Sequence, residues 1–278
     1  MGSQSPFAEK IVLITGGSSG IGLALAKQLA AEGARLWLTG RRPDALAVAG
    51  LEVERAGGRT PGLFPADVSD YAQVEALLAE VVRQDGLPDL VINSAGITHP
   101  GYVQDIPVAV FHRLMEVNYF GTVHVVKAVL PGMIARGSGH IVNISSAAGF
   151  LGVFGYSAYG ASKYAVRGFS DVLRAEMKPY GIRVSIVFPP DTDTPQLAYE
   201  TPLKPPETKI ISGNAKVMSA EAVATAILKG IRRGQYIILP GFDVWLFYHL
   251  NNLLGNAVYL LMDWMVADAR RKKFKAQR

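Results

Sequence analysis

The chain of 278 residues contains no cysteine, and this absence excludes disulfide bridges and thiolate metal sites. Its first ten residues are mostly polar and hold no apolar stretch, so we expect no secretory signal peptide. It also lacks solenoid-type repeats and long low-complexity tracts. Hydrophobic residues make up 49% of the chain, too many for a disordered protein, and the length suits one α/β domain with an ample core.

Acidic residues are scarce at the C-terminal end. The chain has 28 Lys and Arg against 23 Asp and Glu, yet its last twelve residues contain six bases and the single acid Asp268. The net charge of +5 therefore lies in this tail, whose bases are Arg270, Arg271, Lys272, Lys273, Lys275 and Arg278. We expect no nucleic-acid partner, because no recognisable nucleic-acid-binding motif accompanies the bases. A basic run beside an apolar segment suits an anionic membrane surface, and a simply solvated tail is the alternative.

The apolar segment before this tail covers residues 242–266, and the nineteen residues from 244 to 262 include no Asp, Glu, Lys or Arg. A helix of that length could just span a bilayer. At about 100° per residue, however, His249, Asn252, Asn256 and Asp263 would share one side of the helix, and the remainder is apolar. The pattern favours a helix that lies in the interface, on the cytoplasmic face of a membrane. A dimer contact and a flap over the substrate pocket are the alternatives.

The rest of the chain alternates short apolar runs with segments of helical period. We predict strands at 11–15, 35–39, 61–64, 89–93, 139–145, 182–188 and 236–239, and helices at 20–32, 43–56, 70–85, 107–136, 157–179 and 219–233. This order predicts an α/β fold, a doubly wound parallel sheet of the Rossmann type, in a single domain over residues 1–240. Residues 241–278 would form an apolar helix and basic tail. Residues 195–217 are rich in proline, and a loop this long predicts a lid or a binding loop.

A glycine-rich turn follows the first predicted strand. The run 11–14 leads into Thr-Gly-Gly-Ser-Ser-Gly-Ile-Gly at 15–22, and an alanine- and leucine-rich helix comes next. Strand, glycine turn and helix form the context of a dinucleotide site. Glycines let the backbone approach a pyrophosphate, and the N-terminus of a helix favours its charge. A glycine turn without a ligand is the alternative.

No acidic residue ends the second predicted strand, where NAD sites usually carry an Asp or Glu for the ribose 2′-hydroxyl. The strand runs instead into Gly40, Arg41 and Arg42. Two guanidinium groups suit a 2′-phosphate, which Arg can bind through paired hydrogen bonds. The sequence therefore predicts NADPH/NADP+ as the cofactor, unless one or both arginines only solvate a loop.

Tyr159 and Lys163 stand four residues apart, and Ser146 precedes the tyrosine by thirteen residues. On a helix, residues i and i+4 share a face, so the ammonium would lie near the phenol. A free tyrosine has a pKa of about 10, and a fixed positive charge lowers it. Ser146 could then hydrogen-bond a carbonyl oxygen while Tyr159 transfers its proton. A Tyr–Lys pair also occurs on many helix surfaces, so this spacing alone does not establish a catalytic site.

Together these motifs resemble the short-chain dehydrogenase/reductase family over roughly residues 8–195. The Asn-Ser-Ala-Gly turn at 93–96, Asp67-Val68 and the Pro-Pro-Asp-Thr-Asp-Thr segment at 189–194 resemble its motifs around the cofactor, with Ser94 and Pro190 as departures. The resemblance implies an NADP(H)-dependent oxidoreductase, commonly a dimer or tetramer, with Asn118, Ser146, Tyr159 and Lys163 as catalytic residues. The cofactor contacts that it implies are Gly16, Ser18, Ser19, Gly20, Ile21, Gly22, Arg41, Arg42, Asp67, Val68, Asn93, Ala95, Gly96, Tyr159, Lys163, Pro189, Thr192 and Thr194. A non-catalytic, cofactor-sensing scaffold is a remote alternative.

A narrower resemblance concerns the substrate. The segment 189–195, the stretch 207–212 and the apolar extension resemble the branch of the family that reduces 3-ketosphinganine in sphingolipid synthesis. A ketone on a long-chain lipid is therefore the expected substrate, and a hydroxysteroid or an acyl ketone is the alternative. Phe150 and Phe154 follow Ser146 and suit an alkyl chain. Asp191 and Asp193 could pair with an ammonium group of the substrate, or could cap a turn.

Overall fold

The computed structural model describes residues 5–57, 59–213 and 217–276, so Arg278 lies outside the described residues, as do the side chains of Lys273 and Lys275. The strands are β1(Ile11–Thr15), β2(Arg35–Gly40), β3(Gly62–Pro65), β4(Leu90–Asn93), β5(Gly139–Ile144), β6(Ile182–Val187), β7(Thr192–Asp193), β8(Met218–Ser219) and β9(Ile237–Ile238). The helices are α1(Gly20–Ala31), α2(Pro43–Gly57), α3(Tyr71–Gln84), α4(Val108–Leu114), α5(Gly121–Arg136), α6(Ser157–Met177), α7(Pro195–Glu200), α8(Pro206–Ser212), α9(Ala220–Arg232), α10(Phe242–Leu254) and α11(Ala257–Ala276).

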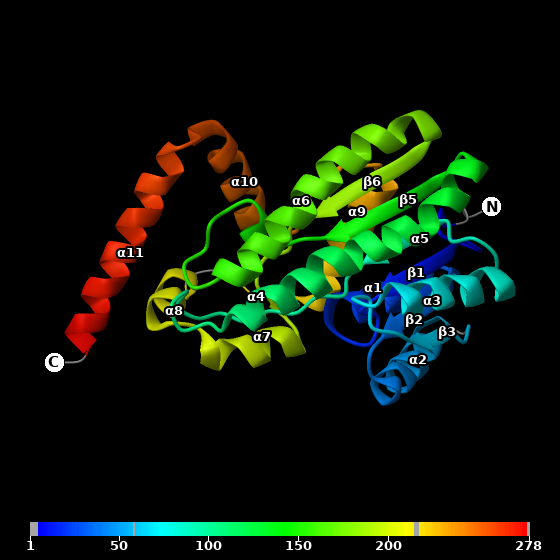
Figure 1. The fold of residues 1–278 in the computed structure, drawn as a ribbon, viewed down its shortest axis with the longest axis horizontal. Helices are drawn as coiled ribbons and strands as arrows, with labels where there is room; N and C mark the ends of the chain where they lie inside the picture. Colours follow the sequence, from blue (N-terminus) through cyan, green and yellow to red (C-terminus); the bar gives the residue numbers. More distant parts are fainter. Residues whose placement is uncertain (1–4, 58, 214–216, 277–278) are drawn as a thin grey trace.

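Seven parallel strands form one sheet in the order β3-β2-β1-β4-β5-β6-β9 (Figure 1). The chain builds outward from β1 through β2 and β3, and then returns to place β4 on the other side of β1. This reversal is the topological switch point, where the carboxyl ends of β1 and β4 leave a crevice for a ligand. The doubly wound parallel fold predicted from the sequence is confirmed.

Each face of the sheet carries its own hydrophobic core. In β1, Val12 and Ile14 pack with buried residues of α1, α2 and α9, whereas Leu13 packs with those of α3, α5 and α6. Successive residues of a strand point to opposite faces, so an apolar run of this kind is buried from both sides. The seven predicted runs therefore became the seven strands of the sheet, with ends within one or two residues of the predicted ones.

The helix predicted at 107–136 is interrupted. α4 ends at Leu114, a π-helical turn spans Met115–Phe120, and α5 begins at Gly121. The prediction of one continuous helix is therefore wrong here, because apolar periodicity does not register a single wide turn. Such turns are frequent at functional sites, and this one carries Asn118.

Residues 195–217 contain two short helices rather than a loop, with 214–216 outside the described residues. Thr194 begins the first of them, α7, because its side-chain oxygen accepts a hydrogen bond from the Leu197 N–H at 3.3 Å. Pro195 and Pro206 occupy the first turns of α7 and α8, where the missing N–H of proline costs nothing. The prolines that suggested a loop are thus helix starts.

The apolar segment 242–266 forms parts of two helices, so the predicted single polar stripe does not exist. α10 ends at Leu254, and Gly255 then adopts a φ of 53°, which side chains rarely adopt. α11 begins two residues later, so His249 and Asp263 lie on different helices. Among the described residues, none of the helices combines the length and the hydropathy that crossing a bilayer requires.

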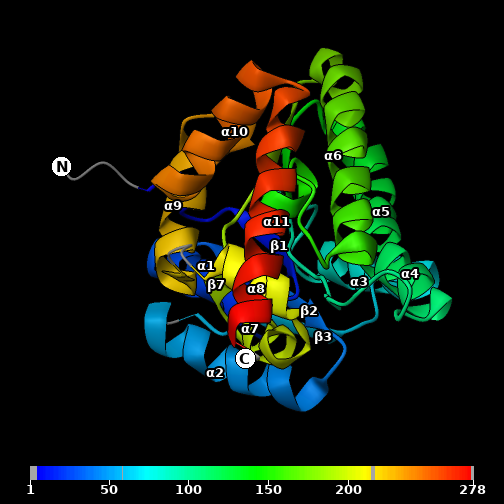
Figure 2. The ribbon, with the colours of Figure 1, turned by 90° about the vertical axis from the view of Figure 1, so that its left-hand side faces the viewer.

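α7, α8, α10 and α11 gather at the end of the molecule toward which the strand arrows point (Figure 1). α10 is fixed to the main body because Val244 and Tyr248 are buried against Phe150 and Phe188. α11 packs against α8 and passes in front of it in Figure 2. The C-terminal helices therefore lie on the same side of the molecule as the carboxyl ends of the strands.

Candidate active site

The glycine turn at 15–22 joins β1 to α1 at the switch point. Gly16 and Gly20 have φ values of 67° and 54°, in the left-handed region that favours glycine. A Cβ on Gly22 would lie 2.3 Å from the Gly16 carbonyl oxygen, and one on Gly16 would lie 2.8 Å from backbone atoms of Ala95. The turn therefore has no room for side chains on its inner side, while its outer side opens toward a cavity at the N-terminus of α1.

The end of β2 presents Arg41 and Arg42, which are both exposed and line the same cavity. Neither guanidinium forms an ion pair within the described part of the chain, so both are available to a ligand. Two uncompensated positive charges at this place suit a phosphate group.

Asp67 and Val68 follow β3 and also line the cavity. The Asp67 carboxylate is already engaged, because Arg113 lies 2.8 Å away and Ser69 donates hydrogen bonds to it. Burial acts to raise the pKa of Asp67, but the hydrogen bonds from Ser69 and Arg113 outweigh burial and hold that pKa below its ordinary value. The carboxylate therefore serves to fix this loop.

One cavity of about 720 Å³ connects these segments, within the usual range of ligand pockets. Of the predicted cofactor contacts, it is lined by Gly16, Ser18, Ser19, Gly20, Ile21, Arg41, Arg42, Asp67, Val68, Ala95, Gly96, Tyr159, Lys163, Pro189, Thr192 and Thr194. Gly22 and Asn93 stand behind its wall. Gly22 is buried in the turn, and the Asn93 amide donates to Asn143 at 2.9 Å.

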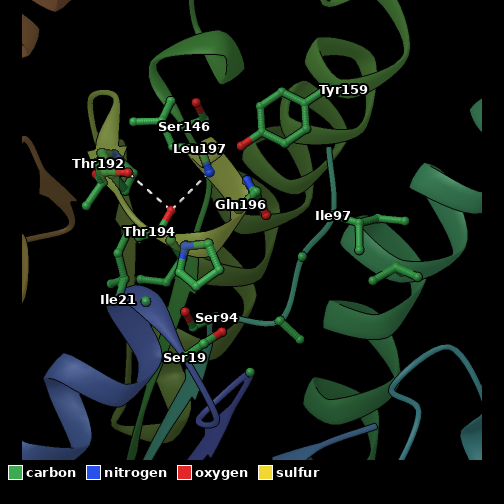
Figure 3. Close-up of a pocket in the computed structure, with 18 of the residues that line it drawn as sticks. Ser19, Ile21, Ser94, Ile97, Ser146, Tyr159, Thr192, Thr194, Gln196 and Leu197 are labelled. Atoms are coloured by element: carbon green, nitrogen blue, oxygen red, sulfur yellow. Dashed lines mark hydrogen bonds between the residues drawn. The ribbon is translucent and has the colours of Figure 1, made fainter. Parts of the chain in front are cut away.

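Ser146 and Tyr159 meet inside this cavity (Figure 3). Ser146 follows β5, and its Oγ caps the next turn by accepting a backbone N–H at 3.2 Å. Tyr159 lies near the start of α6, and its phenol lies beside the side chains of Ser146 and Gln196 (Figure 3). Ser145 points away and donates to the Lys163 carbonyl at 3.0 Å. Because successive side chains alternate in direction, Ser146 and not Ser145 faces the phenol.

Lys163 lies one turn after Tyr159 on the same face of α6. Its side chain is buried, its Nζ donates to the Ile144 carbonyl at 3.0 Å, and the Nζ lies 5.7 Å from the centroid of the Tyr159 ring. Burial lowers the pKa of Lys163 to about 8. A Cβ on Gly96 would lie 3.4 Å from this Nζ and 3.3 Å from Asn118 Oδ1, so amine and amide approach the same glycine.

Asn118 holds the loop after β4 and does not line the cavity. Its Oδ1 accepts from the Ile97 N–H at 2.8 Å, and its Nδ2 donates to the Ile97 carbonyl and to Ser162 Oγ, both at 2.9 Å. The π-helical turn aims the amide at this loop, and Thr122 Oγ1 donates to the Asn118 carbonyl at 2.9 Å. The amide therefore positions the segment that carries Gly96.

The acidity of Tyr159 differs from the prediction. Burial raises the pKa of Tyr159 above its ordinary value; the nearby Ser146 hydroxyl opposes this, and the carboxylates of Glu200 and Asp191 add to it. The expectation of a net lowering of this pKa is wrong, because burial and the two carboxylates outweigh the effect of the Lys163 ammonium. The phenol therefore stays protonated at neutral pH.

Three predicted substrate contacts are not among the residues that line the cavity. Phe150 is buried behind it, 5.1 Å from Tyr248 between ring centroids, and so anchors α10. Phe154 packs edge-on against Tyr102, and Asp193 lies exposed in β7. The sequence placed these residues near Ser146 or the cofactor segment but did not give the direction of their side chains.

Asp191 does line the cavity, together with charged and polar residues that sequence reasoning missed. These residues are Tyr156, Gln196 and Glu200, and Lys204 forms ion pairs behind them. The spacing of Glu200 and Lys204 matches a helical ion pair and could have been noticed in the sequence. Their burial could not, because it depends on how the segment 195–204 folds over the end of the sheet.

A family model described as short chain dehydrogenase matches residues 10–203 of the chain. The chain belongs to the short-chain dehydrogenase family. A curated relative, 3-ketodihydrosphingosine reductase of Bos taurus, is 40% identical over 236 residues, which cover 84% of this chain and 71% of the relative.

Solved structures of the family agree with the fold. A short-chain dehydrogenase from Sphingobium yanoikuyae in complex with NADPH has a TM-score of 0.76 and 30% identity over 91% of this chain and 95% of its own. A family member from Burkholderia phymatum in complex with NAD has a TM-score of 0.80 and 26% identity over 90% of this chain and 95% of its own. Because both dinucleotides occur on this fold, the residues after β2 must decide between them.

Proposed function

We propose that this short-chain dehydrogenase is an NADPH-dependent reductase of a ketone on a long-chain lipid, with 3-ketosphinganine as its substrate. The observation that carries the proposal is the convergence of Ser146, Tyr159 and Lys163 in one cavity with the glycine turn. A cofactor-sensing scaffold would have no need of a buried acid, a hydrogen-bond donor and an amine around one point.

The residues of the cavity fit a phosphorylated nicotinamide dinucleotide. The turn around Gly16 and Gly20 leaves space for a pyrophosphate, and Arg41 and Arg42 suit the 2′-phosphate. By the family resemblance, Lys163 binds the nicotinamide ribose. When bound, NADPH supplies the hydride that reduces the carbonyl carbon of the substrate.

Tyr159 supplies the proton in this proposal. Ser146 donates a hydrogen bond to the carbonyl oxygen, on which negative charge develops, and the phenol O–H passes its proton to that oxygen. The raised pKa of Tyr159 keeps it protonated at neutral pH, which suits reduction, whereas oxidation of an alcohol needs the phenolate. Lys163, with a pKa of about 8, is mainly protonated at pH 7 and stabilises the phenolate that remains.

Two observations support the lipid ketone. The relative in Bos taurus is named for 3-ketodihydrosphingosine, and it is similar to most of this chain. The cavity also has apolar side chains beside the polar site, from Ile97, Val153 and Leu197. These suit an alkyl chain, although a steroid or an acyl ketone makes the same demand.

The decisive experiment follows NADPH oxidation with three ketones: 3-ketosphinganine, a steroid ketone and a long-chain acyl ketone. We expect the highest kcat/KM for 3-ketosphinganine, and a lower rate with NADH than with NADPH. A steroid or acyl ketone that is reduced more efficiently would replace the proposed substrate. Failure of all three ketones, with NADPH bound, would overturn the reductase proposal.

We also propose that α10 and α11 bind the surface of an anionic membrane, where such a substrate resides. Nine large apolar side chains on these helices are exposed: Phe242, Trp245, Leu246, Phe247, Leu253, Leu254, Tyr259, Leu260 and Trp264. The C-terminal part of α11 carries the bases of the tail, whose charge matches that of anionic lipids. Exposed apolar helices beside a basic run are typical of interfacial binding.

Flotation with lipid vesicles tests this surface. The double variant Leu253→Glu with Leu260→Glu should lose binding to vesicles that contain phosphatidylserine. The matched control is Val48→Glu with Val108→Glu, which alters residues of similar exposure, 59% and 71%, on α2 and α4. Equal flotation of both variants and the unmodified chain would contradict the proposal, and concentration-dependent dimerisation without lipid would assign the surface to a second copy.

A further inference from the structure

Glu200, Asp191 and Lys204 form a partly buried ionic cluster at the substrate end of the cavity. We propose that Glu200 and Asp191 bind the ammonium group of an amino-ketone substrate. This inference rests on the proposed function and concerns the substrate specificity of the same site. It predicts that the protein selects ketones with a positively charged nitrogen on the carbon next to the carbonyl carbon.

The cluster is built from three segments that the fold brings together. Asp191 follows β6, Glu200 ends α7, and Lys204 comes one turn later. The Lys204 ammonium lies 3.2 Å from Asp191 Oδ2 and 3.2 Å from Glu200 Oε1. Tyr156, at the start of α6, donates its hydroxyl to the same Glu200 oxygen at 2.8 Å.

Each carboxylate uses only one of its oxygens in these contacts. Within the described residues, Glu200 Oε2 and Asp191 Oδ1 have no hydrogen-bond partner, and both residues line the cavity. Glu200 as a whole is only 6% exposed, but its Oε2 is not among the fully buried oxygens without a partner, so this oxygen is open to the cavity. The two free oxygens are therefore the natural partners for a donor on the substrate.

The charge of the cluster suits a cation. Two carboxylates face one internal ammonium, so one negative charge is uncompensated. A substrate ammonium would bring the cluster to neutrality, whereas a neutral ketone would leave the excess charge in the pocket. Opposite charges at a partly buried site interact more strongly than in water.

The position of the cluster matches the geometry of a 2-amino ketone. Glu200 and Asp191 lie close enough to the Tyr159 hydroxyl to raise its pKa, and the Tyr156 and Tyr159 rings lie 5.8 Å apart between centroids. In such a substrate only two carbon atoms separate the carbonyl oxygen from the nitrogen. An oxygen bound at Ser146 and Tyr159 therefore keeps the nitrogen near the phenol, on whose pKa the two carboxylates act.

The test compares two ketones on a small set of variants. The substrates are 3-ketosphinganine and the same ketone with hydrogen in place of the amino group, and the readout is kcat/KM with NADPH. For Glu200→Gln and Asp191→Asn we expect a loss of about 10- to 100-fold on the amino ketone and a much smaller change on the nitrogen-free ketone. Asp193→Asn is the matched control, because Asp193 is exposed and outside the cavity wall, and it should leave both substrates unchanged.

The outcomes separate this inference from the proposed function. If the unmodified protein reduces neither ketone, the proposed function fails. If it reduces 3-ketosphinganine but each variant loses equal activity on both ketones, the cluster only holds α7 in place and the ammonium site is overturned. We expect the variants to fold, because Gln keeps an oxygen that accepts the hydrogen bond from the Tyr156 hydroxyl. Thermal unfolding of each variant checks this. An unmodified protein without preference for the amino ketone would also contradict the inference.

Discussion

The two ends of the cavity are built in different ways. At the cofactor end, ligand groups meet a turn of consecutive residues whose backbone is packed so tightly that added side-chain atoms collide. At the substrate end, the walls are side chains from α6, from the segment after β6 and from α7. The first design fixes one ligand and tolerates little change, while the second allows selectivity to change by exchange of side chains. Four predictions test this contrast, from the largest expected effect to the smallest.

The chemical centre between the two ends should respond most strongly. Tyr159→Phe removes the proton donor, so we expect kcat to fall about 10²- to 10⁴-fold while NADPH binding, followed by its fluorescence, is retained. Tyr164→Phe is the control, because Tyr164 lies on the same helix and is 42% exposed. Full turnover by the Tyr159 variant would show that another group is the acid.

Charge at the cofactor end should set the preference for the phosphorylated dinucleotide. The double variant Arg41→Ala with Arg42→Ala loses charge-assisted hydrogen bonds to the 2′-phosphate, worth about 1.5–3 kcal/mol. We expect kcat/KM to drop about 10- to 100-fold with NADPH and to change little with NADH. If both cofactors lose activity equally, the arginines support the loop and do not select the phosphate.

Backbone packing at the cofactor end should make one added methyl group costly. In Gly22→Ala the new Cβ meets the Gly16 carbonyl oxygen, so we expect a loss of about 1–3 kcal/mol in the free energy of unfolding and weaker NADPH binding. Gly168→Ala is the matched control, since a Cβ there meets nothing within 4 Å and α6 should gain about 0.5–1 kcal/mol. Chemical denaturation measures both variants. A neutral Gly22→Ala would mean that the turn can rearrange.

The pH profile should show the smallest effect, and it concerns Lys163. The protonated amine supports proton transfer from Tyr159, so kcat/KM should be highest below pH 8 and fall as pH rises through about 8, the pKa of Lys163. The nitrogen-free ketone is the substrate for this measurement, because it has no ammonium of its own to titrate. Lys163→Arg should shift the alkaline limb of the profile to higher pH, since a guanidinium does not titrate in this range. An unchanged limb would assign it to another group.

The contrast also explains what the sequence predicted. The strands, the glycine turn and the positions of Arg41 and Arg42 depend on neighbouring residues, so local patterns identified them. Asp191 was also found, but Glu200 was missed, because its burial depends on α7 folding over the end of the sheet. The raised pKa of Tyr159 escaped the same reasoning, since the spacing to Lys163 contains no information about burial or about carboxylates from other elements.

The burial of Tyr248 against Phe150 and Phe188 has a practical consequence for handling the protein. A chain shortened at residue 240 would lack Tyr248, which covers the rings of Phe150 and Phe188. These two rings lie 5.3 Å apart between centroids, and the truncation would expose their hydrophobic surface to water. Such a truncated protein would aggregate whether or not residues 241–278 bind a membrane.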